Sequence, residues 1–240
     1  MEKLKSGANK LGIELTARQL EQFSIYYQEL IAWNERMNLT AITDYSDVQV
    51  KHFLDSLTVT LALEQPLNTR DFRVIDVGTG AGMPGLPLKI VYPNINLTLL
   101  EATTKKTTFL QHIIDKLELS NVEVIAGRAE DLARYSEYRE KFDIVTARAV
   151  AALPTLVELA LPFCIVGGRF IAMKKHDIDA EIRQAGRAIS ILGGNLRQST
   201  KIDLEELSDN GRQLIIVDKV KATPPRYPRP SGMPSLKPLV

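Results

Sequence analysis

Apolar residues near the start of the chain recur every three or four positions, which is the spacing of one face of an α-helix. Thr16 and Gln19 form a capping box just before this stretch and predict where the helix begins. The apolar stripe that follows consists of Leu20, Phe23, Tyr27, Leu30 and Ile31. We expect this helix to end near residues 34–38, and we expect a second helical stretch over residues 46–63. Residues 1–66 are therefore predicted to form a helical extension ahead of the main domain.

Short apolar runs alternate with segments of helical spacing from residue 72 onward. Five of these runs predict buried strands at residues 73–77, 96–101, 122–126, 142–147 and 168–173. Helices are expected between and after them at residues 86–92, 104–117, 130–135, 153–161 and 179–192. Apolar strands separated by helices indicate a parallel sheet that is covered on both faces. Two further runs, at residues 196–202 and 212–218, predict an antiparallel pair of strands at the edge of that sheet.

The last segment of the chain, residues 223–240, holds six of its twelve prolines and should not form regular secondary structure. We expect an extended basic arm that is ordered only where it packs on the body or on RNA. The preceding residues 67–222 are predicted to form one α/β domain. The whole chain carries a formal net charge of only +1, but bases outnumber acids in its C-terminal third. Such a basic sector suits a polyanionic partner, although ordinary solubilising charge explains it equally well.

The composition limits the classes of protein and site that the chain can represent. Its hydrophobic content of 45% and charged content of 25% are those of a globular protein. The single cysteine, Cys164, excludes an internal disulfide and lies in an apolar run that favours a buried, inert thiol. The three histidines show no ligand spacing, so we expect no metal site. We find no signal peptide and no apolar segment long enough to span a membrane, which predicts a soluble cytoplasmic protein.

The clearest candidate for chemistry is a glycine-rich segment, residues 76–85, between the first strand and the helix that follows it. Gly78, Gly80 and Gly82 alternate there behind Asp76. Glycines allow the backbone to turn tightly and to touch a ligand, and ligands bind at the carboxyl edge of an open α/β sheet. Two cofactors can use such a loop, a nicotinamide dinucleotide or S-adenosylmethionine.

The order of the glycines favours S-adenosylmethionine. A dinucleotide fingerprint, Gly-x-Gly-x-x-Gly, would end at Met83 if counted from Gly78, and would include Pro84 if counted from Gly80. Proline lacks the N–H group that such a loop donates to a pyrophosphate. The pattern Asp-x-Gly-x-Gly-x-Gly fits the segment at every position, so an NAD-dependent oxidoreductase is the weaker interpretation.

Polar residues at the ends of other predicted strands extend this candidate site. Glu101 ends the second strand, and its carboxylate could accept hydrogen bonds from the ribose hydroxyls of either cofactor. Residues 128–131 follow the third strand, where they could hold an adenine or simply begin a helix. Arg148 follows the fourth strand and could face the cofactor carboxylate, a phosphate or a guanine edge, with a surface ion pair as the alternative. His52 and Asp55 lie three residues apart and could line the acceptor pocket, or could have a capping or core role.

Taken in order, these segments resemble the bacterial small-subunit rRNA guanine-N7 methyltransferase family known as RsmG or GidB. The similar stretches are residues 38–42, 52–57, 76–88, 100–101, 105–106, 128–130, 147–151 and 223–234. The resemblance implies a class I S-adenosylmethionine-dependent methyltransferase fold, with a Rossmann-like, mostly parallel sheet and an antiparallel C-terminal edge strand. It implies methylation of N7 of one guanine in 16S rRNA, with the small ribosomal subunit or its precursor as partner. A small-molecule or other nucleic-acid methyltransferase on the same fold is the alternative, and we expect a monomer.

The resemblance also implies which residues contact the donor, and we add a hypothesis for the residues that position the nucleotide and hold the RNA. Donor contacts are expected at Gly78, Gly80, Met83, Glu101, Ala102, Ala129, Glu130 and Arg148. We assign no general base, because N7 of guanine carries a free lone pair; the candidates for positioning the nucleotide are Arg148, Lys174 and His52. RNA contacts are expected at Lys174, Arg226, Arg229 and Lys237. Two positions depart from the family pattern, since Met83 replaces a common aromatic residue and Lys-Lys-His at residues 174–176 replaces Lys-Gly.

Overall fold

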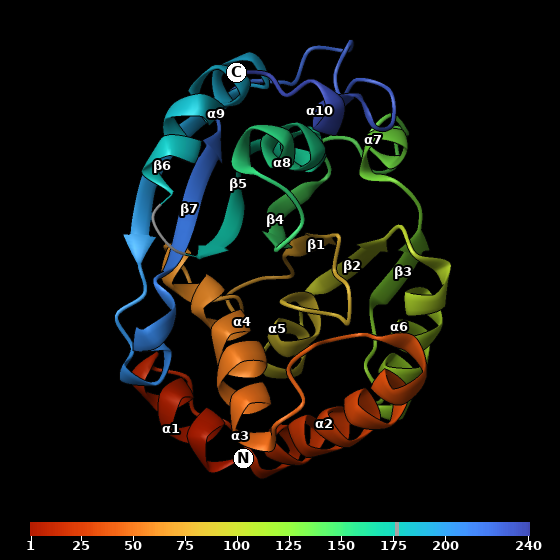
Figure 1. Cartoon of the computed structure of the whole chain (residues 1–240), viewed down its shortest axis with the longest axis vertical. Coiled ribbons are helices and arrows are strands. Elements are labelled where there is room, and N and C mark those ends of the chain that lie inside the picture. Colours follow the sequence, from red (N-terminus) through yellow and green to blue (C-terminus); the bar gives the residue numbers. More distant parts are fainter. Residues whose placement is uncertain (176–177) are drawn as a thin grey trace.

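The computed structural model describes residues 1–175 and 178–240, with residues 208–210 described by their backbone alone. Within this part of the chain a seven-stranded sheet forms the centre of the molecule (Figure 1). The strands are β1 (Arg73–Val77), β2 (Asn96–Glu101), β3 (Val122–Ala126), β4 (Phe142–Arg148), β5 (Cys164–Lys175), β6 (Gly194–Lys201) and β7 (Arg212–Lys219). Their order across the sheet is β3-β2-β1-β4-β5-β7-β6.

The directions of the strands confirm the predicted α/β fold class. Strands β1 to β5 are parallel to one another. Strand β7 lies between β5 and β6 and is antiparallel to both, so the antiparallel pair stands at the predicted edge with β6 outermost. β5 begins four residues earlier than expected, because the buried Cys164 already pairs with Phe142 before the register between β4 and β5 shifts.

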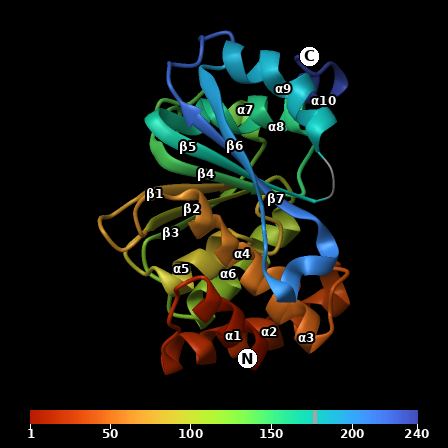
Figure 2. The same cartoon turned by 90° about the vertical axis from the view of Figure 1, so that its left-hand side faces the viewer.

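Helices cover both faces of the sheet (Figure 2). One face carries α1 (Glu2–Lys10), α2 (Ala17–Met37), the helical segment 45–62, α5 (Gly85–Val91) and α6 (Thr104–Lys116). The other face carries α7 (Ala129–Leu132), α8 (Leu153–Ala160), α9 (Asp179–Ile191) and α10 (Met233–Leu236). Alternate strand residues enter the two cores, as Val74 and Ile75 do in β1. The N-terminal helices therefore share a core with the sheet.

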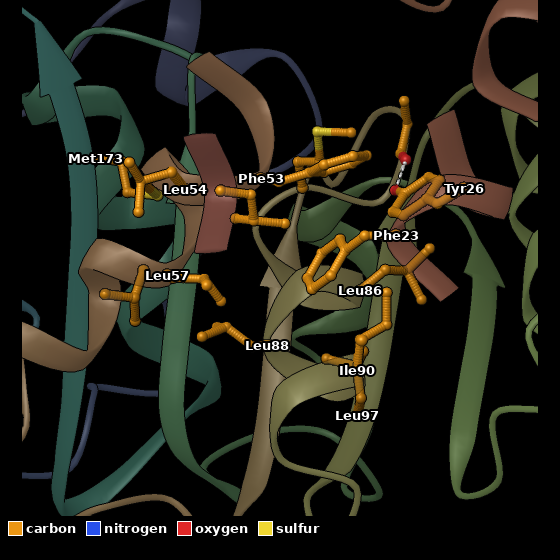
Figure 3. Packing of buried hydrophobic residues seen from close by; sticks show 14 of the residues in the cluster. Phe23, Tyr26, Phe53, Leu54, Leu57, Leu86, Leu88, Ile90, Leu97 and Met173 are labelled. Atoms are coloured by element: carbon orange, nitrogen blue, oxygen red, sulfur yellow. Dashed lines mark hydrogen bonds between the residues drawn. The ribbon is translucent and has the colours of Figure 1, made fainter. Parts of the chain in front are cut away.

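The N-terminal helices pack through an aromatic cluster. The predicted capping box of α2 is confirmed: the Thr16 hydroxyl accepts from the Gln19 N–H, and the Gln19 side chain accepts from the Thr16 N–H. The ring of Phe53 lies 5.0 Å from that of Phe23 and 5.2 Å from that of Tyr26, and all three are fully buried (Figure 3). Such aromatic burial contributes strongly to core stability.

The expected helix over residues 46–63 is present but irregular. It consists of α3 (Tyr45–Val48), a π-helical turn η1 (Gln49–Leu54), α4 (Asp55–Leu57) and a 3₁₀ segment η2 (Thr58–Ala62). π-helical turns are frequent at functional sites. This segment places His52 and Asp55 against Arg148 at the end of β4.

The proline-rich tail, residues 223–240, packs on the body of the protein. The Arg139 guanidinium donates hydrogen bonds to the carbonyl oxygens of Thr223 and Tyr227, each at 2.8 Å. The prediction that the tail has no regular secondary structure was wrong at α10. Pro234 lies in the first turn of this short helix, where its missing N–H interrupts no helical hydrogen bond.

Candidate functional site

The glycine loop that connects β1 to α5 forms one wall of the candidate site. Gly78, Gly80 and Gly82 have φ values of 69°, 62° and 95°, in the left-handed region that favours glycine. The N–H groups of Gly78 and Thr79 donate to the carbonyl of Leu100 at 2.8 and 3.1 Å, which ties the loop to β2. A Cβ added at Gly80 would meet no described atom within 4 Å. This side of the loop is therefore open to a ligand.

Two other segments hold the closed side of the same loop. A Cβ at Gly78 would lie 2.7 Å from a methyl group of Val150, and a Cβ at Gly82 would lie 2.6 Å from the hydroxyl oxygen of Tyr26. That hydroxyl donates a hydrogen bond to the carbonyl of Ala81 (Figure 3). Burial raises the pKa of Tyr26, so its hydroxyl stays protonated and remains a donor. Helix α2 and the segment after β4 thus fix the loop.

Asp76, the acid of the glycine motif, organises the loop from within the core. Its carboxylate accepts hydrogen bonds from the Thr79 hydroxyl at 2.6 Å, the Gly85 N–H at 2.9 Å and the Thr146 hydroxyl at 3.2 Å. The side chain is fully buried, and burial raises the pKa of Asp76 to about 6. Asp76 therefore joins both ends of the loop to β4.

Glu101 lies beside the open side of the glycine loop. Its two carboxylate oxygens accept hydrogen bonds from the Gly80 N–H at 2.9 Å and the Thr103 N–H at 2.8 Å. A carboxylate has about four lone-pair positions, so both oxygens can still accept from hydroxyl groups. Ala102 is exposed directly after it. The position suits the predicted ribose contact, which stays a prediction.

The other predicted donor contacts lie on either side of this wall. Met83 is 3% exposed and belongs to the core between the sheet and the N-terminal helices. Ala129 begins α7 beyond the end of β3, and the neighbouring Glu130 accepts a hydrogen bond from the N–H of Gly232 at 2.9 Å. The tail therefore reaches the same edge of the sheet. Donor contacts of these residues stay predictions.

Arg148, at the end of β4, is the centre of a charged cluster. Its Nη1 lies 2.9 Å from Oδ2 of Asp55, and its Nη2 lies 3.4 Å from Nδ1 of His52. Asp55 is 2% exposed and also pairs with Nη1 of Arg212 at 2.5 Å. The structure thus brings together three sequence candidates, Arg148, His52 and Asp55. Sequence reasoning missed Arg212, although a charged residue that opens an apolar strand is a usable signal.

His52 is held as a neutral ring. Its Nε2 lies 2.7 Å from Oγ1 of Thr40, on the side opposite the nitrogen that faces Arg148. Burial and the adjacent Arg148 guanidinium lower the pKa of His52 to about 3. A neutral imidazole can orient its neighbours by hydrogen bonding but adds no charge to the cluster.

A hollow of about 200 Å³ lies where β4 and β5 end and β7 begins. Its lining consists of Arg148, Ala149, Met173, Lys174, Lys175 and Arg212. The Lys174 ammonium pairs with Glu181 at 2.7 Å and donates to the carbonyl of Ala151 at 2.8 Å, so it is fixed at one wall. A larger cavity of about 410 Å³ lies beside Phe72 and Gly168. This cavity is at the amino ends of the strands, whereas the glycine loop is at their carboxyl ends. The smaller hollow lies at the same edge of the sheet as the glycine loop, since Val150, which follows its lining residue Ala149, lies beside Gly78.

The predicted RNA-contact residues of the tail differ in their surroundings. Arg226 and Lys237 are exposed. Arg229 instead makes a two-pronged pair with the fully buried Glu158 of α8, with Nε at 2.9 Å and Nη2 at 2.6 Å from the carboxylate. Arg229 thus anchors the tail, and its contact with RNA stays a prediction.

Residues 1–175 and 178–240 contain neither a metal-binding cluster of side chains nor a membrane-spanning helix. In these ranges no group of three or more His, Cys, Asp or Glu side chains is arranged to hold a metal ion. The same ranges contain no helix with the length and apolar character that crossing a membrane requires. His176, the last residue of the Lys-Lys-His segment that differs from the family pattern, lies outside the described residues.

Comparison with known sequences identifies the relatives of this chain. Residues 19–210 match the family model described as GidB, rRNA small subunit methyltransferase G. A protein of Dehalococcoides mccartyi (strain CBDB1) named Ribosomal RNA small subunit methyltransferase G is 52% identical over 100% of both chains. A protein of the same name from Lachnoclostridium phytofermentans is 47% identical over 98% of this chain and 95% of its own.

Comparison with solved structures supports the fold. The structure of Aeropyrum pernix fibrillarin in complex with S-adenosyl-L-methionine is similar with a TM-score of 0.51. The two chains are 15% identical over 68% of this chain and 72% of that chain. At this level of identity the similarity shows only a shared fold. Membership of the family follows from the family model and from the high sequence identity to full-length relatives.

Proposed function

The chain belongs to the GidB family, rRNA small subunit methyltransferase G, and we propose that it methylates N7 of a guanine in 16S rRNA. As a member of this family it is an S-adenosylmethionine-dependent methyltransferase. One observation supports the proposal most directly: the glycine loop and the cationic hollow lie at the same edge of the sheet, because Ala149 lines the hollow and the next residue, Val150, lies beside Gly78. A donor on the loop and an acceptor near the hollow would meet there.

The residues around the loop fit the donor. S-adenosylmethionine supplies a methyl group on a sulfonium and has no phosphate, so the loop must allow close approach instead of donating to a pyrophosphate. The open side of Gly80 allows that approach, and the Glu101 carboxylate beside it offers acceptors for ribose hydroxyls. Loop, carboxylate and the start of α7 would together enclose the adenosyl group.

The residues around the hollow fit an acceptor that needs orientation rather than deprotonation. N7 of guanine has a free lone pair, so the protein has to align the base and exclude water. Arg148 is fixed by Asp55 and His52 and would present a guanidinium of set direction to the nucleotide. Lys174 is fixed by Glu181 on the neighbouring wall. This rigidity supports a positioning role for Arg148 and Lys174.

The tail would extend the RNA contact beyond the reacting nucleotide. Arg226 and Lys237 are exposed, while the Gly232 N–H joins the tail to α7, at the same edge of the sheet as the glycine loop. Cations on this segment would contact RNA phosphates near the edge of the sheet that holds the glycine loop and the hollow. A ribosomal RNA substrate also agrees with the expected cytoplasmic location and with the small ribosomal subunit or its precursor as partner.

The test is methyl transfer from labelled S-adenosylmethionine to assembled small subunits and to naked 16S rRNA, with the labelled nucleotide mapped by mass. We expect one 7-methylguanosine in 16S rRNA, and we expect Arg148→Ala to lower its formation strongly. A label on another base or ring atom would contradict the target. Transfer to small molecules but to neither RNA substrate would favour the small-molecule alternative.

A further inference from the structure

The hollow at the ends of β4 and β5 carries an excess of positive charge. Arg148, Arg212 and Lys175 line it, and Asp55 lies behind them, paired with both arginines. Lys174, the fourth cation of the lining, has its own carboxylate partner. Among the described lining residues, Arg148, Arg212 and Lys175 therefore face one carboxylate, Asp55, which pairs with the two arginines.

Burial makes this excess charge unfavourable in the protein alone. Arg212 is 5% exposed, and its Nε has no hydrogen-bond partner among the described residues. Burial lowers the pKa of Arg212, and partial desolvation at the rim of the hollow together with the Arg212 and Arg148 guanidinium groups lowers the pKa of the exposed Lys175. The neutral His52 offers no compensation. Buried cations are stable when they are paired, so the cluster is suited to an anion from outside the chain.

We infer that this hollow binds a phosphate group of the RNA substrate, an inference that rests on the proposed function. Lys175 is exposed and would contact the phosphate directly, while Arg148 and Arg212 supply the positive field beneath it. The volume of about 200 Å³ is below the roughly 300–1,000 Å³ of pockets that enclose a whole ligand, so it suits one phosphate group. A guanine edge offers neutral acceptors and would leave the excess charge uncompensated.

A phosphate held here has a consequence for the reacting base. Ala149 lines the hollow, and the next residue, Val150, contacts the glycine loop at Gly78. The nucleotide attached to this phosphate would therefore extend toward the donor side of the site. Lys175 would act as a positioning residue that sets the register of the RNA.

The first experiment compares Lys175→Gln with Lys141→Gln. Lys141 is exposed and precedes β4, on the opposite edge of the sheet, so its variant makes the same charge change away from the hollow. RNA affinity is measured at several salt concentrations, and donor affinity by calorimetry. We expect Lys175→Gln to weaken RNA binding about tenfold and to reduce the slope of log K against log salt by about one unit. Donor affinity should not change, Lys141→Gln should resemble wild type, and Lys175→Arg should restore binding.

The second experiment removes single charges from the RNA. Oligonucleotides that carry one neutral methylphosphonate linkage, placed in turn at each position around the target guanine, are bound to wild type and to Lys175→Gln. We expect one position to weaken wild-type binding about tenfold and to have no further effect on the variant, because both changes remove the same contact.

The outcomes separate this inference from the proposed function. Additive losses at every position, or an unchanged salt slope for Lys175→Gln, overturn the phosphate site if wild type still methylates 16S rRNA. Failure of wild type to methylate 16S rRNA overturns the proposed function, and this inference with it.

Discussion

Asp55 is the carboxylate that both arginines of the hollow, Arg148 and Arg212, share among the described residues, and its removal should destabilise the protein. Asp55→Asn leaves Arg148 and Arg212 facing each other without a counter-charge in a nearly water-free position. Breaking a buried ion pair in this way costs about 3–5 kcal/mol, and urea unfolding would measure the loss. Asp47→Asn is the matched control, because Asp47 makes an exposed pair with Lys51 that is worth about 1 kcal/mol or less. Similar losses for both variants would contradict a special role for Asp55.

Tyr26 should affect donor binding although it lies about fifty residues before the glycine motif. Tyr26→Phe removes the hydroxyl that donates to Ala81 and leaves a buried loop carbonyl unpaired, at a cost of about 1–3 kcal/mol. We expect weaker binding of S-adenosylhomocysteine by calorimetry, with RNA affinity unchanged. Tyr27→Phe is the control, because that hydroxyl makes a longer bond, at 3.3 Å, to Thr43 outside the loop. Equal donor affinity for both variants would refute the prediction.

His52 should make the stability of the protein sensitive to acid. Its folded-state pKa of about 3 is below the ordinary value of 6.5, so the unfolded chain binds a proton first as the pH falls. Stability from the neutral ring is complete above pH 6.5 and is lost as the pH falls toward 3, by about 1.4 kcal/mol per unit. We therefore expect the difference in unfolding free energy between wild type and His52→Gln to shrink by about 2 kcal/mol from pH 6.5 to 5. A difference that does not depend on pH would exclude a buried neutral His52.

At the scale of elements, the tail separates anchoring from RNA contact. Arg229→Ala leaves the fully buried Glu158 without its partner, which should cost about 3–5 kcal/mol and expose the tail to hydrogen exchange. Arg226→Ala removes an exposed cation, so stability should stay within about 0.5 kcal/mol of wild type. Its RNA salt slope should fall by about one unit. Exchange protection of residues 223–240 and salt titrations of RNA binding would check both variants.

The sequence predicts best the elements whose conformation is determined by local patterns, such as a short apolar run or a capping box. The first three strands have the predicted bounds, and α2 begins at its capping box. The π-helical turn η1 was not predictable, because it packs against α1 and its wider spacing leaves no distinct apolar period in the sequence. Helix α1 was not predicted as a separate helix. Its Gly7 is required by tertiary packing, because a Cβ there would clash with a methyl group of Leu54, and no local pattern reports that contact.

The candidate site was predictable in its motif and much less so in its assembly. The glycine loop and Glu101 are contiguous patterns, and the structure places them together. The cluster of Asp55, Arg148 and Arg212 joins residues far apart in sequence, and no local pattern reports such a contact. The ion pair of Arg229 was not predictable for the same reason, because its partner Glu158 lies far away in sequence, within a mostly apolar helix.

At the scale of the whole molecule, the donor should stabilise the entire fold. The glycine loop contacts β2, α2 and the segment after β4, so a ligand bound to it is linked to both cores. A ligand at one hundred times its Kd adds about 2.7 kcal/mol to the free energy of unfolding by mass action. We expect S-adenosylhomocysteine to raise Tm and NAD to leave it unchanged. A rise with NAD instead would revive the oxidoreductase interpretation.

The shared core between the N-terminal helices and the sheet limits how this enzyme can be shortened. A chain begun at residue 67 would retain all seven strands and the glycine motif, and would look like a minimal catalytic unit. It would nevertheless lack the counter-ion of its own arginines and the hydroxyl that steadies its donor loop. The N-terminal helices are thus not an independent module. A sheet grafted into another protein without them would keep its topology but would lose the contacts that hold its arginines and its donor loop in place.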